Sequence, residues 1–218
     1  MPTMLPSYLR NPWRAARIWM DPFRADYRQR MARCLAPLFD APITSVLDVG
    51  CDDGELATEI TALVPRLEFQ GVDIQSHRPS AIPRKLFDGR TIPFDDGSFD
   101  AVMAIDVLHH TRQIGPLLAE MARVSRKYVI IKDHLTDGPA SMIVVGVADY
   151  LSNAPYGIPC EFNFPTLDGW QRYFAASRLK IVEFRRNLDL GAATIARYNP
   201  LFKLEKLAAC QRAGRKPR

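Results

Sequence analysis

The stretch T-S-V-L-D-V-G-C-D-D-G-E-L-A, from Thr44 to Ala57, decides the fold of this chain. Its first part, Ser45 to Val49, is apolar except for Asp48, which is the pattern of a buried parallel strand. Two glycines then bracket a tight turn, because glycine accepts backbone angles that other residues avoid. A helix is expected to follow at Glu55 to Val64, with Leu56, Ile60 and Leu63 on one face. Strand, glycine turn and helix together open a nucleotide-binding α/β unit.

The spacing of the glycines distinguishes between nucleotides. A dinucleotide fingerprint G-x-G-x-x-G that began at Gly50 would need glycines where the chain has Asp52 and Glu55. The pattern Asp48-x-Gly50-x-Asp52-x-Gly54 instead resembles the first motif of class I S-adenosylmethionine (SAM) dependent methyltransferases, an acidic residue followed by G-x-G-x-G. Asp52 occupies the place of the middle glycine. Two interpretations of its carboxylate stay open, a hydrogen bond to the ammonium group of SAM or repulsion of the SAM carboxylate.

A second acidic residue follows at the distance that a ribose requires. Leu67 to Asp73 is predicted to be a strand, and Asp73 lies nineteen residues after Gly54. An acid about 20 residues beyond a glycine turn can accept hydrogen bonds from both ribose hydroxyl groups. The resemblance places two further residues against the cofactor, Cys51 in the turn and Ile74 directly after Asp73.

Linked motifs extend the resemblance over about ninety residues, Thr44 to His134. They look like those of the small-molecule methyltransferase family called type 11, and they read Asp88-Gly89, Ile92-Pro93-Phe94, Ser98-Phe99-Asp100 and Val107-Leu108-His109-His110. In that family the first pair lies by the adenine amino group, and the residue that ends the fourth strand lies along the cofactor. The resemblance therefore assigns cofactor contacts to Asp88, Gly89 and Ile105.

Apolar runs predict further strands at residues 84–87, 99–105, 128–132, 179–184 and 201–204, with helices at 116–126, at 140–152 and after Thr166. The expected fold is α/β, a Rossmann-like, seven-stranded, mostly parallel sheet flanked by helices, with an N-terminal helical cap. The resemblance implies that the last two strands form an antiparallel hairpin. The expected organisation is a helical cap at 1–40, a SAM-dependent methyltransferase domain at 41–206 and a basic C-terminal tail at 207–218.

The N-terminal forty residues are expected to contain two helix starts. Asn11-Pro12 and Asp21-Pro22 each pair a capping side chain with a proline at the first helical position. The second helix would carry an apolar stripe that needs a partner, formed by Phe23, Tyr27, Met31 and Leu35. We predict that this segment covers the acceptor pocket.

The net charge of +5 is unevenly placed. Residues 1–40 hold seven Arg against three Asp, and residues 203–218 hold six Lys or Arg against one Glu. Basic ends around a more acidic middle favour an anionic substrate, or peripheral membrane contact through the N-terminal helices, over nucleic acid binding. Solvated helix faces explain the same pattern equally well.

Four scattered cysteines, without a C-x-x-C pair, indicate a reducing cytoplasm and no zinc site; they are Cys34, Cys51, Cys160 and Cys210. The first ten residues lack the apolar core of a signal peptide, which also favours a cytoplasmic location. Asp106 and Asp133 each follow a strand and resemble a magnesium pair of catechol-type methyltransferases, but no third oxygen ligand can be identified. No metal is therefore expected.

The sequence thus predicts a SAM-dependent methyltransferase that acts on an oxygen or nitrogen atom of a small-molecule, lipid-linked or glycan-linked acceptor. Such an acceptor can need a base, and His110 is the first candidate, ahead of His109 and His134. Tyr156 and Glu161 lie on a loop that is expected to cover the acceptor. Two alternatives remain, a SAM-binding protein of the same fold without transfer activity and, with less support from the glycine spacing, a nicotinamide oxidoreductase.

Overall fold

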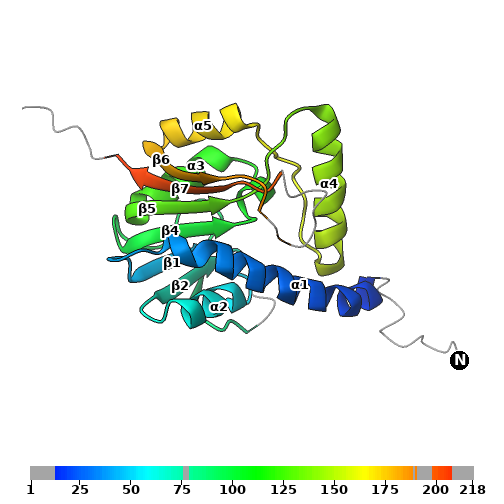
Figure 1. Ribbon diagram of the computed structural model, residues 1–218, viewed down its shortest axis with the longest axis horizontal. Coiled ribbons are helices and arrows are strands. Elements are labelled where there is room, and N and C mark those ends of the chain that lie inside the picture. Colours follow the sequence, from blue (N-terminus) through cyan, green and yellow to red (C-terminus); the bar gives the residue numbers. More distant parts are fainter. Residues whose placement is uncertain (1–12, 76–78, 189, 191–197, 208–218) are drawn as a thin grey trace, which may run out of the picture.

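The computed structural model describes residues 13–75, 79–188, 190 and 198–207, with side chains described from Pro22 onward. Its centre is a seven-stranded sheet in the order β3-β2-β1-β4-β5-β7-β6 (Figure 1). The strands are β1 (Ser45–Val49), β2 (Glu68–Asp73), β3 (Arg84–Leu86), β4 (Phe99–Ile105), β5 (Ser125–Lys132), β6 (Leu179–Arg185) and β7 (Leu201–Lys206). The predicted seven-stranded Rossmann-like sheet is confirmed.

The sheet is parallel except for β7, which pairs antiparallel with both β5 and β6. The strand order runs outward from β1 to β2 and β3 on one side, and the chain then crosses to β4 on the other side of β1, so β1 and β4 lie side by side at the centre. Ligands bind at the carboxyl ends of the strands at such a switch point. The residues that follow β1, β2, β4 and β5 therefore share one edge of the sheet.

Helices cover both faces of the sheet. One core contains α1 (Trp13–Leu35) and α2 (Glu55–Leu63), which pack on Ala101, Met103 and Ile130. The other contains α3 (Ile114–Val124) and α5 (Leu167–Ala176), which pack on the alternate residues of the same strands, Val102 and Val129 among them. This alternation is the period of two that a strand buried on both faces requires.

The N-terminal segment forms one helix where two helix starts were predicted. Asn11-Pro12 lies outside the described residues, and Pro22 lies inside α1, so the start predicted at Asp21-Pro22 is wrong. An interior proline costs a helix roughly 3 kcal/mol. The complete burial of Met31 and Leu35, about 1.5–3 kcal/mol for each side chain, offsets that cost.

The predicted apolar stripe of α1 is buried only in its second half. Met31 and Leu35 are inaccessible to solvent, whereas Phe23 is 75% exposed. The buried half belongs to the core of the domain, together with Leu38 of the short helix η2 (Ala36–Leu38). The cap is therefore built into the domain that it was predicted to cover.

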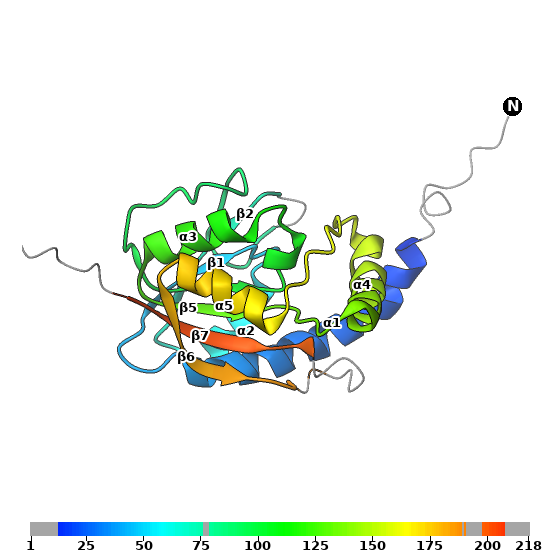
Figure 2. The same cartoon turned by 90° about the horizontal axis from the view of Figure 1, so that it is seen from above.

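A further helix, α4 (Pro139–Asn153), stands beyond the carboxyl ends of the strands, and the short helix η4 (Ala154–Tyr156) follows it. Figures 1 and 2 both place α4 beyond that edge and show the N-terminal half of α1 extending toward it. Arg24 of α1 lies 4.1 Å from the ring centroid of Tyr156, which joins the two helical segments. Together they border the edge where ligands bind.

Two local predictions differ from the structure. The helix predicted at residues 116–126 is α3, and Ser125 and Arg126 instead begin β5, where the Ser125 hydroxyl donates to the Tyr128 carbonyl at 2.8 Å. Leu63 was predicted on the buried face of α2 with Leu56 and Ile60, but it is 51% exposed. The buried positions are Ala57, Ile60 and Val64, so the face of α2 that packs on the core passes beside Leu63.

Candidate active site

The glycine turn between β1 and α2 has the backbone that its sequence predicts. Gly50 and Gly54 have φ values of 74° and 72°, in the left-handed region where glycine is favoured. A Cβ atom on Gly50 would lie 2.5 Å from a methyl carbon of Val107, so the chain that follows β4 passes directly against the turn. The turn and the end of β4 therefore form one surface.

Asp73 joins the turn to the end of β2. One oxygen of its carboxylate accepts a hydrogen bond from the Asp52 amide at 2.9 Å, and the other accepts from the Gln75 amide at 3.0 Å. A carboxylate has about four acceptor positions, so two remain for a vicinal diol. Position and chemistry fit the predicted ribose contact.

Asp48 lies beneath this surface, 4% exposed, within β1. Burial and then the charge of Asp73 raise the pKa of the Asp48 carboxyl to about 8. Cys51 is also buried, and its sulfur occupies the space beside Gly71 of β2, where a Cβ atom would lie 2.4 Å from it. Both residues pack the turn onto the sheet from below.

The residues assigned to the adenine side lie close together. Ile74 is 56% exposed, and a Cβ atom on Gly89 would lie 3.2 Å from its side chain. The Asp88 carboxylate accepts from the amides of Arg90 and Thr91, at 2.8 and 2.7 Å, and these bonds hold the pKa of that carboxyl below its usual range. Ile105 ends β4 on the same edge and is partly buried. An exposed apolar side chain beside a glycine is a surface that suits an adenine ring, so these residues fit SAM.

Asp52 is directed toward the N-terminal helix. Its carboxylate lies 3.6 Å from the guanidinium of Arg24, and Arg28 forms an ion pair with Glu55 one turn further along. Arg84 of β3 donates to the Asp52 carbonyl. Neither predicted role of the Asp52 carboxylate, with the ammonium or the carboxylate of SAM, accounts for this ion pair. Sequence spacing gave no signal that would have found it.

A buried polar group attaches α1 to the ends of β4 and β5. The Lys132 ammonium donates to the Tyr27 hydroxyl at 2.8 Å and forms an ion pair with Asp106, and the same hydroxyl donates to Asp106. Burial opposes the ionised form of Asp106, but Lys132 holds the pKa of that carboxyl well below its usual range. Burial, followed by the charge of Asp106, raises the pKa of Tyr27 well above its usual value. The Asp106 carboxylate is thus already held by two donors of the chain.

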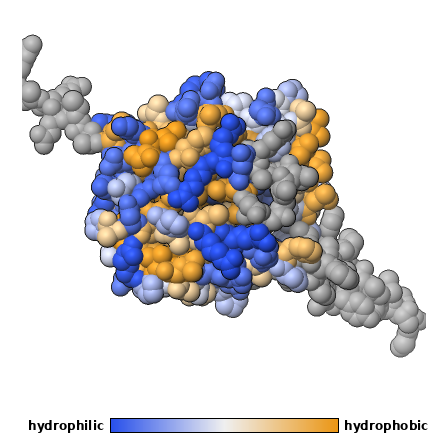
Figure 3. Space-filling view, viewed as in Figure 1, coloured by the Kyte–Doolittle hydropathy of each residue, from blue (hydrophilic) through white to orange (hydrophobic). Residues whose placement is uncertain are grey.

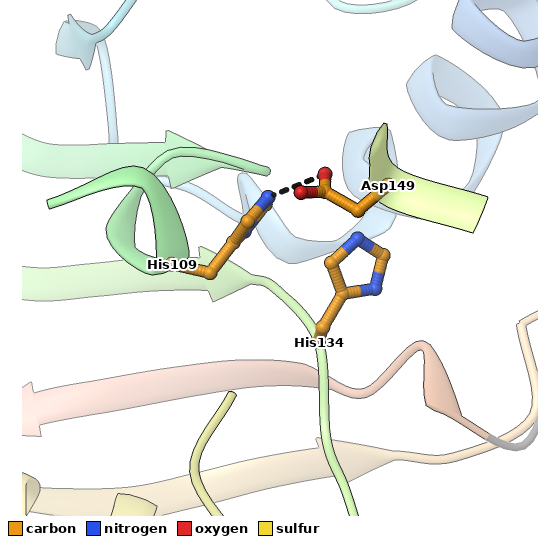
Figure 4. A group of neighbouring side chains, drawn as sticks. All are labelled: His109, His134 and Asp149. Atoms are coloured by element: carbon orange, nitrogen blue, oxygen red, sulfur yellow. Dashed lines mark hydrogen bonds and ion pairs between the residues drawn. The ribbon is translucent and has the colours of Figure 1, made fainter. Parts of the chain in front are cut away.

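A second buried group surrounds His109, in the short helix η3 (Leu108–His110) that follows β4. Its Nδ1 lies 2.7 Å from the Asp133 carboxylate and its Nε2 lies 3.1 Å from Asp149 of α4 (Figure 4). Asp133 also accepts the amides of Leu108 and His134, at 2.9 and 2.7 Å. Burial opposes a charge on His109, yet the two carboxylates raise its pKa to about 10. Asp106 and Asp133, the pair weighed for magnesium, are therefore each engaged by other groups of the chain.

The two neighbouring histidines both have a lowered pKa. Burial and the charge of His109 lower the pKa of His110, whose Nδ1 lies 2.9 Å from the Pro159 carbonyl. Burial and then Lys132 lower the pKa of His134 to about 4. Their rings lie beside that of His109, with centroids at 4.0 and 4.6 Å. The three histidines singled out in the sequence thus meet under α4.

The two loop residues that were predicted to cover the acceptor occupy the rim of this region. Tyr156 contacts Arg24, and Glu161 lies 3.5 Å from Arg112, an ion pair at the protein surface. A surface groove of about 420 Å³ opens elsewhere, between the loop at 163–166 and α5. None of the residues expected to bind SAM lines that groove. The candidate site is therefore placed at the carboxyl edge of the sheet, where those residues lie.

Comparison with protein families identifies the class. A family model described as a methyltransferase domain matches residues 20–183, more than half of the chain. The chain belongs to this methyltransferase family, and its fold and glycine turn are those of class I SAM-dependent methyltransferases. SAM is the cofactor of this class.

Individual relatives match over shorter regions. The chain is 30% identical over 89 residues to a malonyl-[acyl-carrier protein] O-methyltransferase of Legionella pneumophila. The matched region covers 36% of this chain and 31% of that protein. It is 30% identical over 90 residues to a phthiotriol/phenolphthiotriol dimycocerosates methyltransferase of Mycobacterium tuberculosis, with coverage of 37% and 33%. The chain thus spans about a third of the length of these curated relatives.

A solved structure of geranyl diphosphate methyltransferase in complex with SAM superposes with a TM-score of 0.60 at 15% identity. The superposition covers 82% of this chain and 85% of that chain, and it shows the shared fold. In the part of the chain that the structure describes, no helix is both long and apolar enough to cross a membrane.

Proposed function

We propose that this protein transfers the methyl group of SAM to an oxygen or nitrogen atom of a small acceptor that carries an apolar portion. When bound, SAM supplies a methyl group that is already activated on a sulfonium. The chain has then to align the acceptor with that group and to exclude water. The single observation that carries the acceptor class is the apolar outer face of α4.

That outer face contains no charged side chain. Six residues of α4 are between 46% and 67% exposed, and they are Met142, Ile143, Val144, Val147, Tyr150 and Leu151. The one charged residue of the helix, Asp149, is turned inward and is 4% exposed. Figure 3 shows an apolar patch at the position that α4 occupies in Figure 1.

Contiguous exposed apolar surface on a soluble domain marks a contact with an apolar ligand or partner. The patch lies on the helix whose inner face holds Asp149 against His109. An acceptor with an apolar portion on α4 could place its polar end at the histidines. The name of one curated relative, which specifies dimycocerosates, supports the same class.

His110 is proposed as the group that activates the acceptor. Its Nδ1 is held by the Pro159 carbonyl, so Nε2 keeps a lone pair. Its side chain is 17% exposed, against 1% for His109, and it is therefore the more accessible of the two. Such a lone pair can act on the acceptor hydroxyl or amine.

We also propose that the N-terminal half of α1 covers the acceptor. Tyr27 hydrogen-bonds Asp106 at the end of β4, and Arg24 contacts both Asp52 and Tyr156. Removing residues 1–38 would not test this role, because Met31, Leu35 and Leu38 belong to the core. Substitutions at Arg24 and Tyr27 test it instead. Peripheral membrane contact through the basic N-terminal segment stays a prediction.

The activity is tested by incubating the protein with methyl-labelled SAM and an extract separated into lipid, protein and aqueous fractions. We expect label to enter the lipid or the organic-soluble fraction. Calorimetric titration with SAM is the control for binding. SAM binding without label in any fraction would support the alternative, a binding protein of methyltransferase fold. Label confined to water-soluble compounds would contradict the apolar acceptor.

A further inference from the structure

Asp149 is buried with one oxygen lacking a partner. Its Oδ1 accepts from the Asn153 side-chain amide at 2.7 Å and lies 3.1 Å from His109 Nε2. Its Oδ2 is inaccessible to solvent and has no hydrogen-bond partner among the described residues. An unpaired carboxylate oxygen in a buried site costs about 1–3 kcal/mol or more. A ligand that is positively charged would remove this cost.

Two further electron-pair donors converge on the same carboxylate. His110 donates its Nδ1 proton to the Pro159 carbonyl at 2.9 Å, so its Nε2 carries a lone pair, 3.8 Å from Asp149 Oδ1. The sulfur of Cys160 lies in the same group, and its thiol donates to the Ile158 carbonyl at 4.0 Å. The ligand atoms of His110, Asp149 and Cys160 all lie within 4.8 Å of one another.

We propose that His110 Nε2, Asp149 Oδ2 and Cys160 Sγ bind one divalent transition metal of the zinc type. Nitrogen, sulfur and carboxylate oxygen are the donor set of zinc, at about 2.0–2.3 Å from the ion. Three protein ligands leave the fourth tetrahedral position open, as in catalytic zinc sites. Binding of the metal displaces the thiol proton of Cys160 to solvent.

The surrounding contacts are those of a metal site. Metal-bound histidines usually donate their other ring N–H to a carbonyl or carboxylate, which His110 does toward Pro159. The Asp149 carboxylate is oriented through its other oxygen by Asn153 and His109, and His109 is itself held by Asp133. Figure 4 shows His134 beside His109 and Asp149, and its ring centroid lies 4.6 Å from that of His109.

The inference departs from the sequence analysis, which expected no metal. The three ligands come from η3, from α4 and from the loop after η4, so no short motif announces them. For its role in the reaction, the inference rests on the proposed function. At its open position the metal could bind the acceptor oxygen or nitrogen and lower the pKa of that group. Because the Nε2 lone pair of His110 would then be bound to the metal, His110 would act on the acceptor through the metal and not directly as a base.

The test uses the full chain, stripped with a chelator, dialysed and then titrated with Zn²⁺ or Co²⁺. We expect one metal ion per chain by elemental analysis after gel filtration. The cobalt form should show both the visible bands of tetrahedral Co²⁺ and a near-ultraviolet thiolate band. Cys160→Ser should lose the thiolate band, and Asp149→Asn and His110→Gln should each weaken binding at least about tenfold, the factor that 1.4 kcal/mol gives.

Cys34→Ser is the matched control, because Cys34 lies on α1, outside this cluster. It should leave both metal content and the thiolate band unchanged. Circular dichroism and SAM titration on every variant show that the fold is retained. Chains that retain no metal, or a thiolate band that survives in Cys160→Ser, would overturn the proposal.

Labelled transfer measured on the same samples separates this inference from the proposed function. Metal binding in a protein that transfers no methyl group would leave the site standing and overturn the function. Transfer at an unchanged rate by the stripped protein would overturn the catalytic role of the metal.

Discussion

At the scale of single residues, Asp73 joins the glycine turn to the end of β2 and is predicted to bind the ribose of SAM. Its carboxylate holds the Asp52 amide and retains acceptor positions for a ribose. We expect Asp73→Ala to weaken SAM binding roughly ten- to hundredfold, because charge-assisted hydrogen bonds contribute about 1.5–3 kcal/mol. Isothermal titration calorimetry measures the change. Glu68→Ala, at the exposed opposite end of β2, is the control and should bind normally. An unchanged affinity in folded Asp73→Ala would remove this residue from the site.

Asp48 gives the protein a pH dependence of its own. Burial raises the pKa of its carboxyl to about 8, against 3.8 for the ordinary group. The native state therefore binds a proton that the unfolded chain releases, and the contribution of Asp48 to the free energy of unfolding falls as pH rises from about 4 to about 8. Below this window the contribution is fully present.

We expect Asp48→Asn to abolish that part of the pH dependence, since an amide does not titrate. Urea unfolding of both proteins at pH 5, 7 and 9 measures the difference between them, in which the titration of all other groups cancels. The variant should gain stability relative to the parent as pH rises. A constant difference over this range would show that Asp48 titrates normally.

At the scale of elements, the group formed by Tyr27, Asp106 and Lys132 attaches α1 to the edge of the sheet. Tyr27→Phe removes a hydroxyl that is both donor and acceptor, and it leaves the ion pair in place. We expect a loss of about 1–3 kcal/mol in the free energy of unfolding. Amide exchange should become faster in the N-terminal half of α1.

The control for this prediction lies one turn away on the same helix. Phe23 is 75% exposed, so Phe23→Ala should change stability by no more than about 0.5 kcal/mol. If Tyr27→Phe retained full stability and unchanged exchange in α1, the attachment of the helix would rest on other contacts. If it also retained full transfer activity, the proposed cover over the acceptor would lose its support.

At the scale of the whole molecule, the apolar face of α4 is proposed to bind the apolar portion of the acceptor, and the polar groups beneath it are proposed to act on the polar end. The double substitution Ile143→Ser and Val147→Ser changes only exposed side chains, 67% and 53% accessible. We expect it to raise KM for an apolar acceptor at least about tenfold while SAM affinity stays constant, since each side chain removed from water contributes about 1.5–3 kcal/mol.

The matched control is Val182→Ser, which alters a side chain on β6 that is 46% exposed. It should leave KM, SAM affinity and the unfolding midpoint unchanged. Steady-state kinetics with the labelled acceptor, once identified, give KM. An unchanged KM in the α4 variant would mean that the apolar face does not contact the acceptor.

Much of the fold could be predicted because its signals are local. The strands β1 and β4 are specified by their own apolar residues, and the tight turn is specified by the two glycines within it. The acid Asp73 likewise stands at the end of the strand β2 that positions it. Backbone freedom and the two-residue period of buried strands act at that range. These signals were sufficient for the sheet, the turn and the class of protein.

The contacts of the site depend instead on residues far apart in the chain. Asp52 was recognised as unusual, yet its partner Arg24 lies 28 residues earlier, on α1. His109 was identified without Asp133 and Asp149, which lie 24 and 40 residues further along the chain. Leu63 fits the apolar face of α2 by its spacing, but the face that packs is formed by Ala57, Ile60 and Val64, and Leu63 faces solvent.

The sequence alone therefore determined the sheet, the glycine turn and the cofactor class, because neighbouring residues fix the backbone there. Only the tertiary structure decided which carboxylate faces which histidine and where α1 is attached. Those pairings follow from how helices pack on the sheet, and the burial of side chains over the whole domain selects that packing.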